Sequence, residues 1–127
     1  MPAERRPPDL IARTRAFSLA TIHFYSRMPR QPVAQILGRQ LLRSATSVGA
    51  QYREAQRAKS TADFISKTEG ALQEVDEAGY WLELIQDSGL ETGDSINTLR
   101  AEVRELLAIF VAITRKAKEN KLGKQRV

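Results

Sequence analysis

An unbroken heptad repeat between Phe64 and Ile85 constrains the fold of this chain more than any other feature. Its positions are spaced alternately four and three residues apart, at Phe64, Thr68, Ala71, Val75, Ala78, Leu82 and Ile85. No proline interrupts the run, and polar residues fall between these positions. This pattern is typical of a long α-helix that packs against other long helices.

Two segments before this repeat also have helical periodicity. Asp9 is a suitable N-cap for a first helix, and Pro29 and Pro32 bracket a short turn because neither fits a helix interior. Pro32 then suits the first turn of a second helix, which we expect to fray around Lys59. The first helix carries the stripe Leu10, Phe17, Phe24 and Met28, with Thr14 and Thr21 beside it. The second carries Leu37, Leu41, Ala45, Val48 and Tyr52.

The third helix is expected to begin after Ser60, with Asp63 completing a capping box, and to end at Gly89. Thr92 or Asp94 can cap a fourth helix that reaches about Asn120. Its repeat is Ile96, Leu99, Val103, Leu106, Phe110, Ile113 and Ala117. Long helices joined by short turns predict an all-α, antiparallel up-down-up-down four-helix bundle over residues 9–120. Residues 1–8 are expected to form a flexible arm and residues 121–127 a basic tail.

Composition narrows the possible function classes. The chain has 127 residues and no cysteine, which predicts one domain without disulfides or thiolate metal sites and is compatible with the cytoplasm. No segment approaches the roughly 18 apolar residues that a membrane span requires. The charge is uneven: residues 1–59 hold eleven basic and three acidic side chains, whereas residues 60–114 hold three and eleven. Such asymmetry is compatible with plain solvation, with complementary surfaces, or with a basic surface that meets nucleic acid.

Two charged stripes follow from the helical projection. The arginine stripe of the second helix consists of Arg39, Arg43, Arg53 and Arg57. The acidic stripe of the third helix consists of Glu69, Asp76, Glu83 and Asp87. Both point away from the predicted core, so we expect that they cannot fully pair within one subunit. Three readings stay open, namely solvated surfaces, pairing between subunits, and arginine contacts with phosphates.

Two further groups of residues are candidate interaction surfaces. Ile11, Ile22 and Tyr25 form a second apolar rank on the first helix, which predicts a subunit interface. The C-terminal segment is rich in cations, which favours either a solvated tail or electrostatic contact with nucleic acid. Its members are Arg115, Lys116, Lys118, Lys121, Lys124 and Arg126.

No catalytic or metal-binding constellation is present in the sequence. His23, the single histidine, projects away from the Phe17 and Phe24 stripe. Glu74 and Glu77 lack the histidine partner that metal-binding bundles use. Ser44 and Ser47 have no base to activate them. We therefore expect no enzyme activity and no cofactor.

Residues 74–84 read Glu-Val-Asp-Glu-Ala-Gly-Tyr-Trp-Leu-Glu-Leu and are followed by Ser88, Gly89 and Leu90. This run resembles the third-helix signature of a bacterial four-helix-bundle family, often encoded in intervening sequences of large-subunit ribosomal RNA genes. The family includes the accessory variability determinant of diversity-generating retroelements. Residues 43–48, Arg-Ser-Ala-Thr-Ser-Val, resemble its second-helix segment, although Val48 and Gly49 replace its usual Ile-Pro break.

The resemblance implies a homopentameric ring and a non-enzymatic role, and its retroelement member binds a reverse transcriptase and nucleic acid. We therefore predict a homo-oligomeric binding or adaptor protein that contacts RNA or DNA through the arginine stripe and the C-terminal cations. Two alternatives stay open: an accessory subunit of a reverse transcriptase, and a purely structural oligomer whose arginine stripe is used in subunit contacts.

Overall fold

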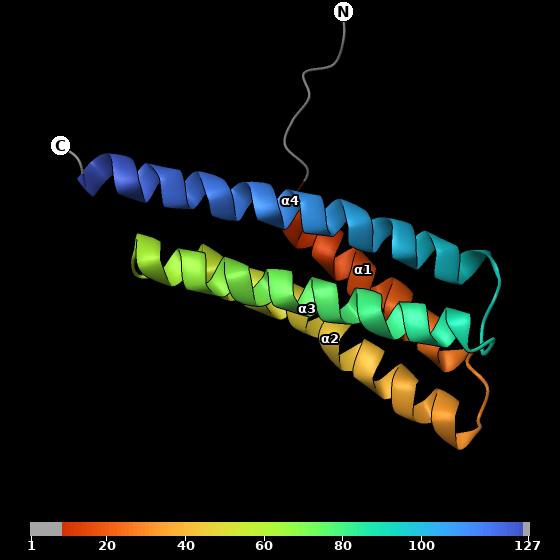
Figure 1. Cartoon of the computed structure of the whole chain (residues 1–127). Helices are drawn as coiled ribbons and strands as arrows, with labels where there is room; N and C mark the ends of the chain where they lie inside the picture. Colours follow the sequence, from red (N-terminus) through yellow and green to blue (C-terminus); the bar gives the residue numbers. More distant parts are fainter. Residues whose placement is uncertain (1–8, 126–127) are drawn as a thin grey trace, which may run out of the picture.

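The computed structural model describes residues 9–125, with side chains through residue 123. These residues form four helices and no strand, namely α1 (Leu10–Ser26), α2 (Pro32–Gln56), α3 (Thr61–Asp87) and α4 (Asp94–Gln125) (Figure 1). The all-α class and the four predicted helices are thereby confirmed. The arm expected over residues 1–8, Arg126, Val127 and the side chain of Lys124 lie outside the described residues.

The helix ends follow the local signals in the sequence. The Ala12 amide donates to the Asp9 carboxylate at 3.2 Å, and the Asp63 amide donates to the Ser60 hydroxyl at 3.0 Å. At the end of α3, Gly89 adopts a left-handed φ of 79°. This conformation lets the Leu90 amide donate to the Ile85 carbonyl at 3.2 Å, which completes a Schellman motif. Helix α4 continues to Gln125, past the boundary expected at Asn120.

One core collects buried side chains from all four helices. On α3 the buried positions from Thr68 to Ile85 are the predicted ones, but Ile65 takes the buried place expected for Phe64. On α4 Thr114 is buried, whereas the predicted Ile113 is only half-buried. A straight helix has 3.6 residues per turn and drifts by about 20° per heptad, so a strict heptad register slips with distance along the helix.

The buried threonines satisfy their hydroxyl groups within their own helices. Thr14 donates to the Leu10 carbonyl at 2.8 Å, and Thr21 donates to the Phe17 carbonyl at 2.9 Å. Thr114 donates to the Phe110 carbonyl at 2.8 Å. Burying these polar groups is therefore tolerable, because no donor is left without an acceptor.

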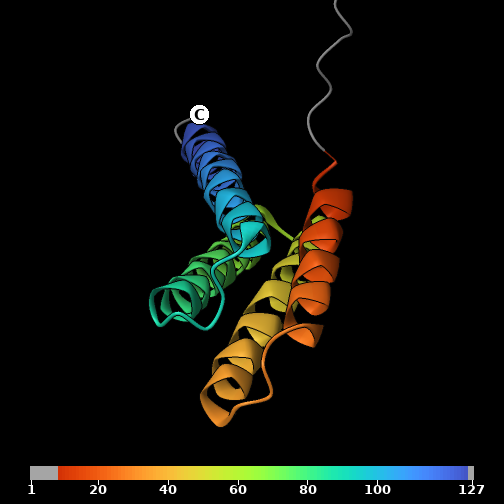
Figure 2. The ribbon, with the colours of Figure 1, turned by 90° about the vertical axis from the view of Figure 1, so that its right-hand side faces the viewer.

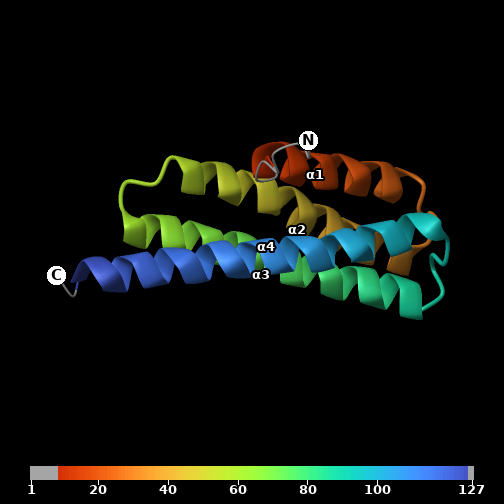
Figure 3. The same ribbon diagram turned by 90° about the horizontal axis from the view of Figure 1, so that it is seen from above.

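The four helices do not cover the bundle equally. Helix α1 has 17 residues and α4 has 32, and α1 stops short of the α2–α3 turn that α4 reaches (Figure 3). That end of the described structure is therefore built from α2, α3 and α4. Viewed along the bundle, α1 and α2 lie on one side and α3 and α4 on the other (Figure 2). Contacts between α1 and α4 are sparse compared with those of α2 with α3.

Candidate nucleic-acid interface

Basic residues predominate on α1 and α2 and acidic residues on α3, whereas α4 carries both. Helices α1 and α2 carry five arginines and a single acidic residue, Glu54, whereas α3 carries seven acidic residues and a single lysine, Lys67. Helices α1 and α2 lie on the same side of the molecule (Figure 2), and we call this the basic side because three of their arginines, Arg15, Arg39 and Arg53, are exposed and form no ion pair among the described residues. The uneven distribution of charge along the sequence therefore corresponds to an uneven distribution among the helices.

The four residues of the arginine stripe are all exposed. Arg43 donates to Glu77 on α3 at 3.0 Å, so this member does pair within the subunit. Arg39, Arg53 and Arg57 form no ion pair among the described residues. The expectation that the stripe cannot fully pair internally therefore holds for three members, and Arg43 departs from it because α3 presents Glu77 beside it.

The acidic stripe is divided in a similar way. Glu69 accepts a hydrogen bond from Lys118 at 3.1 Å. Asp76, Glu83 and Asp87 are exposed and form no ion pair in residues 9–123. Asp76 and Glu83 line a groove of about 380 Å³ between α3 and α4, with the exposed Tyr80 between them. Arg100 and Arg104 of α4 line the same groove, so its charge is mixed.

Two of the three residues in the predicted apolar rank of α1 are exposed, and the third packs within the subunit. Ile11 and Ile22 are exposed, at 38% and 42%. Tyr25 instead packs within the subunit, because its ring lies against Gly38 and its hydroxyl donates to Gln35 at 2.9 Å. Leu19, which the sequence interpretation missed, is 38% exposed and lies on the same face. Its spacing, eight residues after Ile11 and three before Ile22, could have revealed it.

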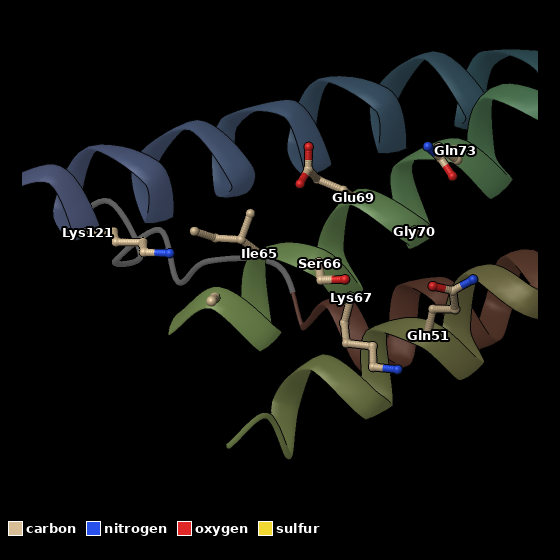
Figure 4. Close-up of a pocket in the computed structure, with 9 residues that line it drawn as sticks. Gln51, Ile65, Ser66, Lys67, Glu69, Gly70, Gln73 and Lys121 are labelled. Atoms are coloured by element: carbon tan, nitrogen blue, oxygen red, sulfur yellow. The ribbon is translucent and has the colours of Figure 1, made fainter. Parts of the chain in front are cut away.

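The C-terminal cations lie along the last turns of α4. Arg115 and Lys116 are exposed, whereas Lys118 is paired with Glu69. Lys121 lies at the rim of an open groove of about 580 Å³ beside the start of α3 (Figure 4). Lys67, Glu69 and Gln51 line the same groove, so its charge is mixed. Arg115 and Lys116 are therefore better placed for phosphates than Lys118.

Glu77 and Glu74 lie on the side of α3 that faces α2. The Glu77 carboxylate accepts hydrogen bonds from Arg43 at 3.0 Å and from the Trp81 indole at 3.4 Å. One carboxylate oxygen of Glu74 is buried without a partner. Burial raises the pKa of Glu74, the nearby charge of Arg43 lowers it, and Glu77 raises it further. The carboxyl group of Glu74 is thus held less favourably in its charged form.

No metal-binding group is present among the described residues. No cluster of three histidine, cysteine, aspartate or glutamate side chains forms there. His23 is exposed, and the hydroxyl of Ser44 is buried with no hydrogen-bond partner. None of the described helices is long and apolar enough to cross a membrane.

Arg15 is a basic residue of this surface that the sequence interpretation did not single out. It is exposed on α1 and, with Arg53 of α2, lines a groove between the two helices. The helical projection held the signal, because Arg15 lies on the side of α1 away from Leu10 and Phe17. The basic side therefore extends across the α1–α2 boundary.

Comparison with known proteins bears on the whole of this architecture. The profile of a family described as 23S rRNA-intervening sequence protein matches residues 9–112. A crystal structure of a protein with unknown function from the S23 ribosomal protein family of Bacteroides thetaiotaomicron is similar, with 30% identity and a TM-score of 0.77. The match covers 83% of this chain and 97% of that one. No curated protein matches the sequence.

Proposed function

Because the chain belongs to the family of 23S rRNA-intervening sequence proteins, we propose that it is a non-enzymatic, homo-oligomeric adaptor of the cytoplasm that binds nucleic acid through its basic side. The observation that carries the proposal is the set of exposed, unpaired arginines on α2 and at its C-cap. Arg39, Arg53 and Arg57 have no carboxylate partner within the described residues.

Exposed arginines of this kind suit a phosphate backbone. The guanidinium group is planar and always charged, and it presents paired donors that match phosphate oxygens. Each phosphate contact releases counterions, so the affinity falls as salt rises. Arg115 and Lys116 supply further cations on α4. Contacts of this kind hold a nucleic-acid backbone without reading its bases.

The direct test is a salt series of RNA and DNA binding by the wild-type protein and by the double variant Arg39→Gln with Arg57→Gln. The double variant is expected to flatten the log–log salt slope by roughly 0.7 to 0.9 per lost contact. Arg104→Gln is the matched control, because Arg104 is an exposed arginine of α4 that lines the α3–α4 groove and forms no ion pair among the described residues. A wild-type protein without measurable affinity at about 50 mM salt would overturn the proposal, because such contacts are strong there.

The proposed assembly is a ring of five up-down-up-down bundles. The exposed apolar face of α1 and the unpaired acidic residues of α3 support a contact between copies, since each offers surface that the subunit leaves uncovered. A head-to-tail contact of unlike surfaces closes into a ring when its rotation permits. Light scattering coupled to size exclusion tests this directly. A mass of 14.3 kDa, that of one chain, would contradict it.

The two alternative functions make different predictions for the arginine stripe. If the stripe pairs with Asp76 and Glu83 of a neighbouring copy, the Arg39 and Arg57 variant loosens the oligomer, and charge reversal on both helices restores it. If it contacts phosphates, the oligomer persists and only nucleic-acid binding weakens. An accessory subunit of a reverse transcriptase would instead co-purify with that enzyme.

A further inference from the structure

The groove between α1 and α2 combines arginine side chains with hydroxyl groups. It has a volume of about 390 Å³, and Arg15 and Ser18 of α1 and Thr46 and Arg53 of α2 line it. Gly49 forms part of the groove, and a side chain there would meet the Thr14 hydroxyl at 3.3 Å. The lack of a side chain at Gly49 therefore lets the two helices approach closely and keeps the groove open.

The hydroxyl groups of this groove are already committed as donors. Ser18 donates to the Ala45 carbonyl across the helix interface and to the Thr14 carbonyl, both at 3.2 Å. Thr46 donates to the Leu42 carbonyl at 2.8 Å. A hydroxyl oxygen that has given its proton to a carbonyl still has lone pairs to accept a hydrogen bond. The half-buried oxygens of Ser18 and Thr46 are thus acceptors toward the groove.

The free donors of the groove are its two arginines. Arg15 and Arg53 are exposed, and neither forms an ion pair within the described residues. The proximity of Thr14 to Gly49 and of Ser18 to Ala45 shows that residue numbers rise along α1 as they fall along α2. Arg53 therefore lies about five residues along the bundle from Arg15, roughly 7.5 Å at 1.5 Å per residue. Two flexible side chains at this spacing can reach neighbouring phosphates of one strand.

We propose that this groove binds the backbone of single-stranded RNA and distinguishes it from DNA. Arg15 and Arg53 hold phosphates, and the oxygens of Ser18 and Thr46 accept a hydrogen bond from a ribose 2′-hydroxyl. The 2′-hydroxyl is the donor that RNA has and DNA lacks. The inference rests on the proposed nucleic-acid function and adds the class of nucleic acid and the group that is recognised.

Three ligands and two sets of variants test the groove. The ligands are a short oligouridine, its 2′-deoxyuridine counterpart and its 2′-O-methyl counterpart, which differ only at the ribose. Thr46→Val removes one of the two hydroxyl acceptors and keeps the branched shape. Thr98→Val is its matched control, because Thr98 is exposed on α4 and donates to the Asp94 carbonyl at 3.0 Å in the same backbone geometry.

The wild-type protein is expected to bind oligouridine more tightly than either modified strand. Thr46→Val should weaken oligouridine binding by about 3- to 10-fold, the usual effect of one hydrogen bond, and leave deoxyuridine binding unchanged. Thr98→Val should change neither. Arg15→Gln with Arg53→Gln should weaken binding of both strands and lower the salt slope by about 0.7 per arginine. Thermal melting of each variant confirms that it is folded.

Several outcomes would overturn the groove assignment. Equal affinity of the wild type for the three strands removes the role of the 2′-hydroxyl. Loss of binding in the Arg39 and Arg57 variant, with none in the Arg15 and Arg53 variant, keeps the proposed function and rejects this groove. Failure of every strand to bind rejects the proposed function itself. Preference for vesicles that contain phosphatidylserine over RNA would assign the arginines to lipid phosphates instead.

Discussion

Helices α1 and α3 belong to the same bundle but occupy different places in it. Helix α3 packs between α2 and α4, and seven of its residues are buried along one continuous stripe. Helix α1 packs mainly on α2 and meets α4 through polar contacts. The Arg13 guanidinium donates to both carboxylate oxygens of Glu102, at 2.8 and 2.9 Å.

The central position of α3 and the peripheral position of α1 give the two helices different roles. A central helix has neighbours on two sides, so its outer strip is narrow and is occupied by charges such as Asp76 and Glu83. A peripheral helix keeps a wider outer face, on which α1 exposes Ile11, Leu19 and Ile22. We therefore expect substitutions on α3 to affect folding, and substitutions on the outer face of α1 to affect assembly and binding.

The largest expected effect is that of Leu82→Ala on α3. Leu82 is fully buried, so removing its side chain should lower the free energy of unfolding by about 2–5 kcal/mol. Ile22→Ala on α1 is the comparison, because Ile22 is a large apolar residue that is 42% exposed. It should cost less than about 0.5 kcal/mol in the subunit and loosen the oligomer. Urea unfolding and light scattering measure the two effects, and equal losses of stability would contradict the comparison.

A smaller effect is expected where α3 ends. Gly89→Ala places a side chain on a backbone with a φ of 79°, although nothing lies within 4 Å of it. The cost, about 1–2 kcal/mol, is therefore backbone strain alone. Gly93→Ala is the control, since its surroundings are equally open and its φ is not positive. A melting temperature lowered equally by both substitutions would show that the left-handed conformation of Gly89 is not what matters.

A still smaller loss of stability is expected when the contact between α1 and α4 is weakened. Glu102→Gln replaces a charge-assisted pair with a neutral one, and the side chains of Arg13 and Glu102 are only 31% and 26% exposed. The expected loss is about 1 kcal/mol. Hydrogen exchange should speed up in α1 more than in α3 if α1 is the more loosely held helix. Glu119→Gln, also exposed on α4 and in no ion pair among the described residues, should leave exchange unchanged.

The contrast between a central and a peripheral helix also explains which features could be predicted from the sequence. Helix limits depend on local chemistry, so Asp9, Ser60 and Gly89 were informative on their own. The buried positions of α3 were also predictable, because a helix with neighbours on both sides needs a regular apolar stripe. The predicted stripes were less accurate elsewhere: Phe64 and Ile113 are only half-buried because a heptad register drifts along a straight helix, and Leu37 and Tyr52 of α2 are half-buried as well.

The candidate interface was less predictable, because it depends on distances between helices. A projection of α2 alone showed that Arg43 points outward, but it could not show that Glu77 of α3 lies beside it. Nor could it show that Lys118 pairs with Glu69, or that Tyr25 fills the space above Gly38. The α1–α2 groove arises from the close approach at Gly49, and no single-helix pattern contains that information.

The smallest expected effect concerns Glu74, on the side of α3 that faces α2. Burial raises the pKa of this carboxyl group above its ordinary value, against the opposing charge of Arg43. A folded-state pKa above the unfolded one means that the folded protein holds the proton more tightly. The stabilising contribution is therefore complete below the unfolded pKa and is lost as the pH rises through the folded pKa.

Glu74→Gln should consequently raise the melting temperature at about pH 7, and the gain should shrink as the pH falls toward the ordinary pKa of a glutamate, about 4.3. Glu83→Gln is the control, because Glu83 is exposed on the outer strip of the same helix. Melting curves across this pH range measure both. If Glu74→Gln instead lowered stability at neutral pH, attraction by Arg43 would outweigh burial. The α2–α3 contact would then be stabilised by its charges, as the α1–α4 contact is by Arg13 and Glu102.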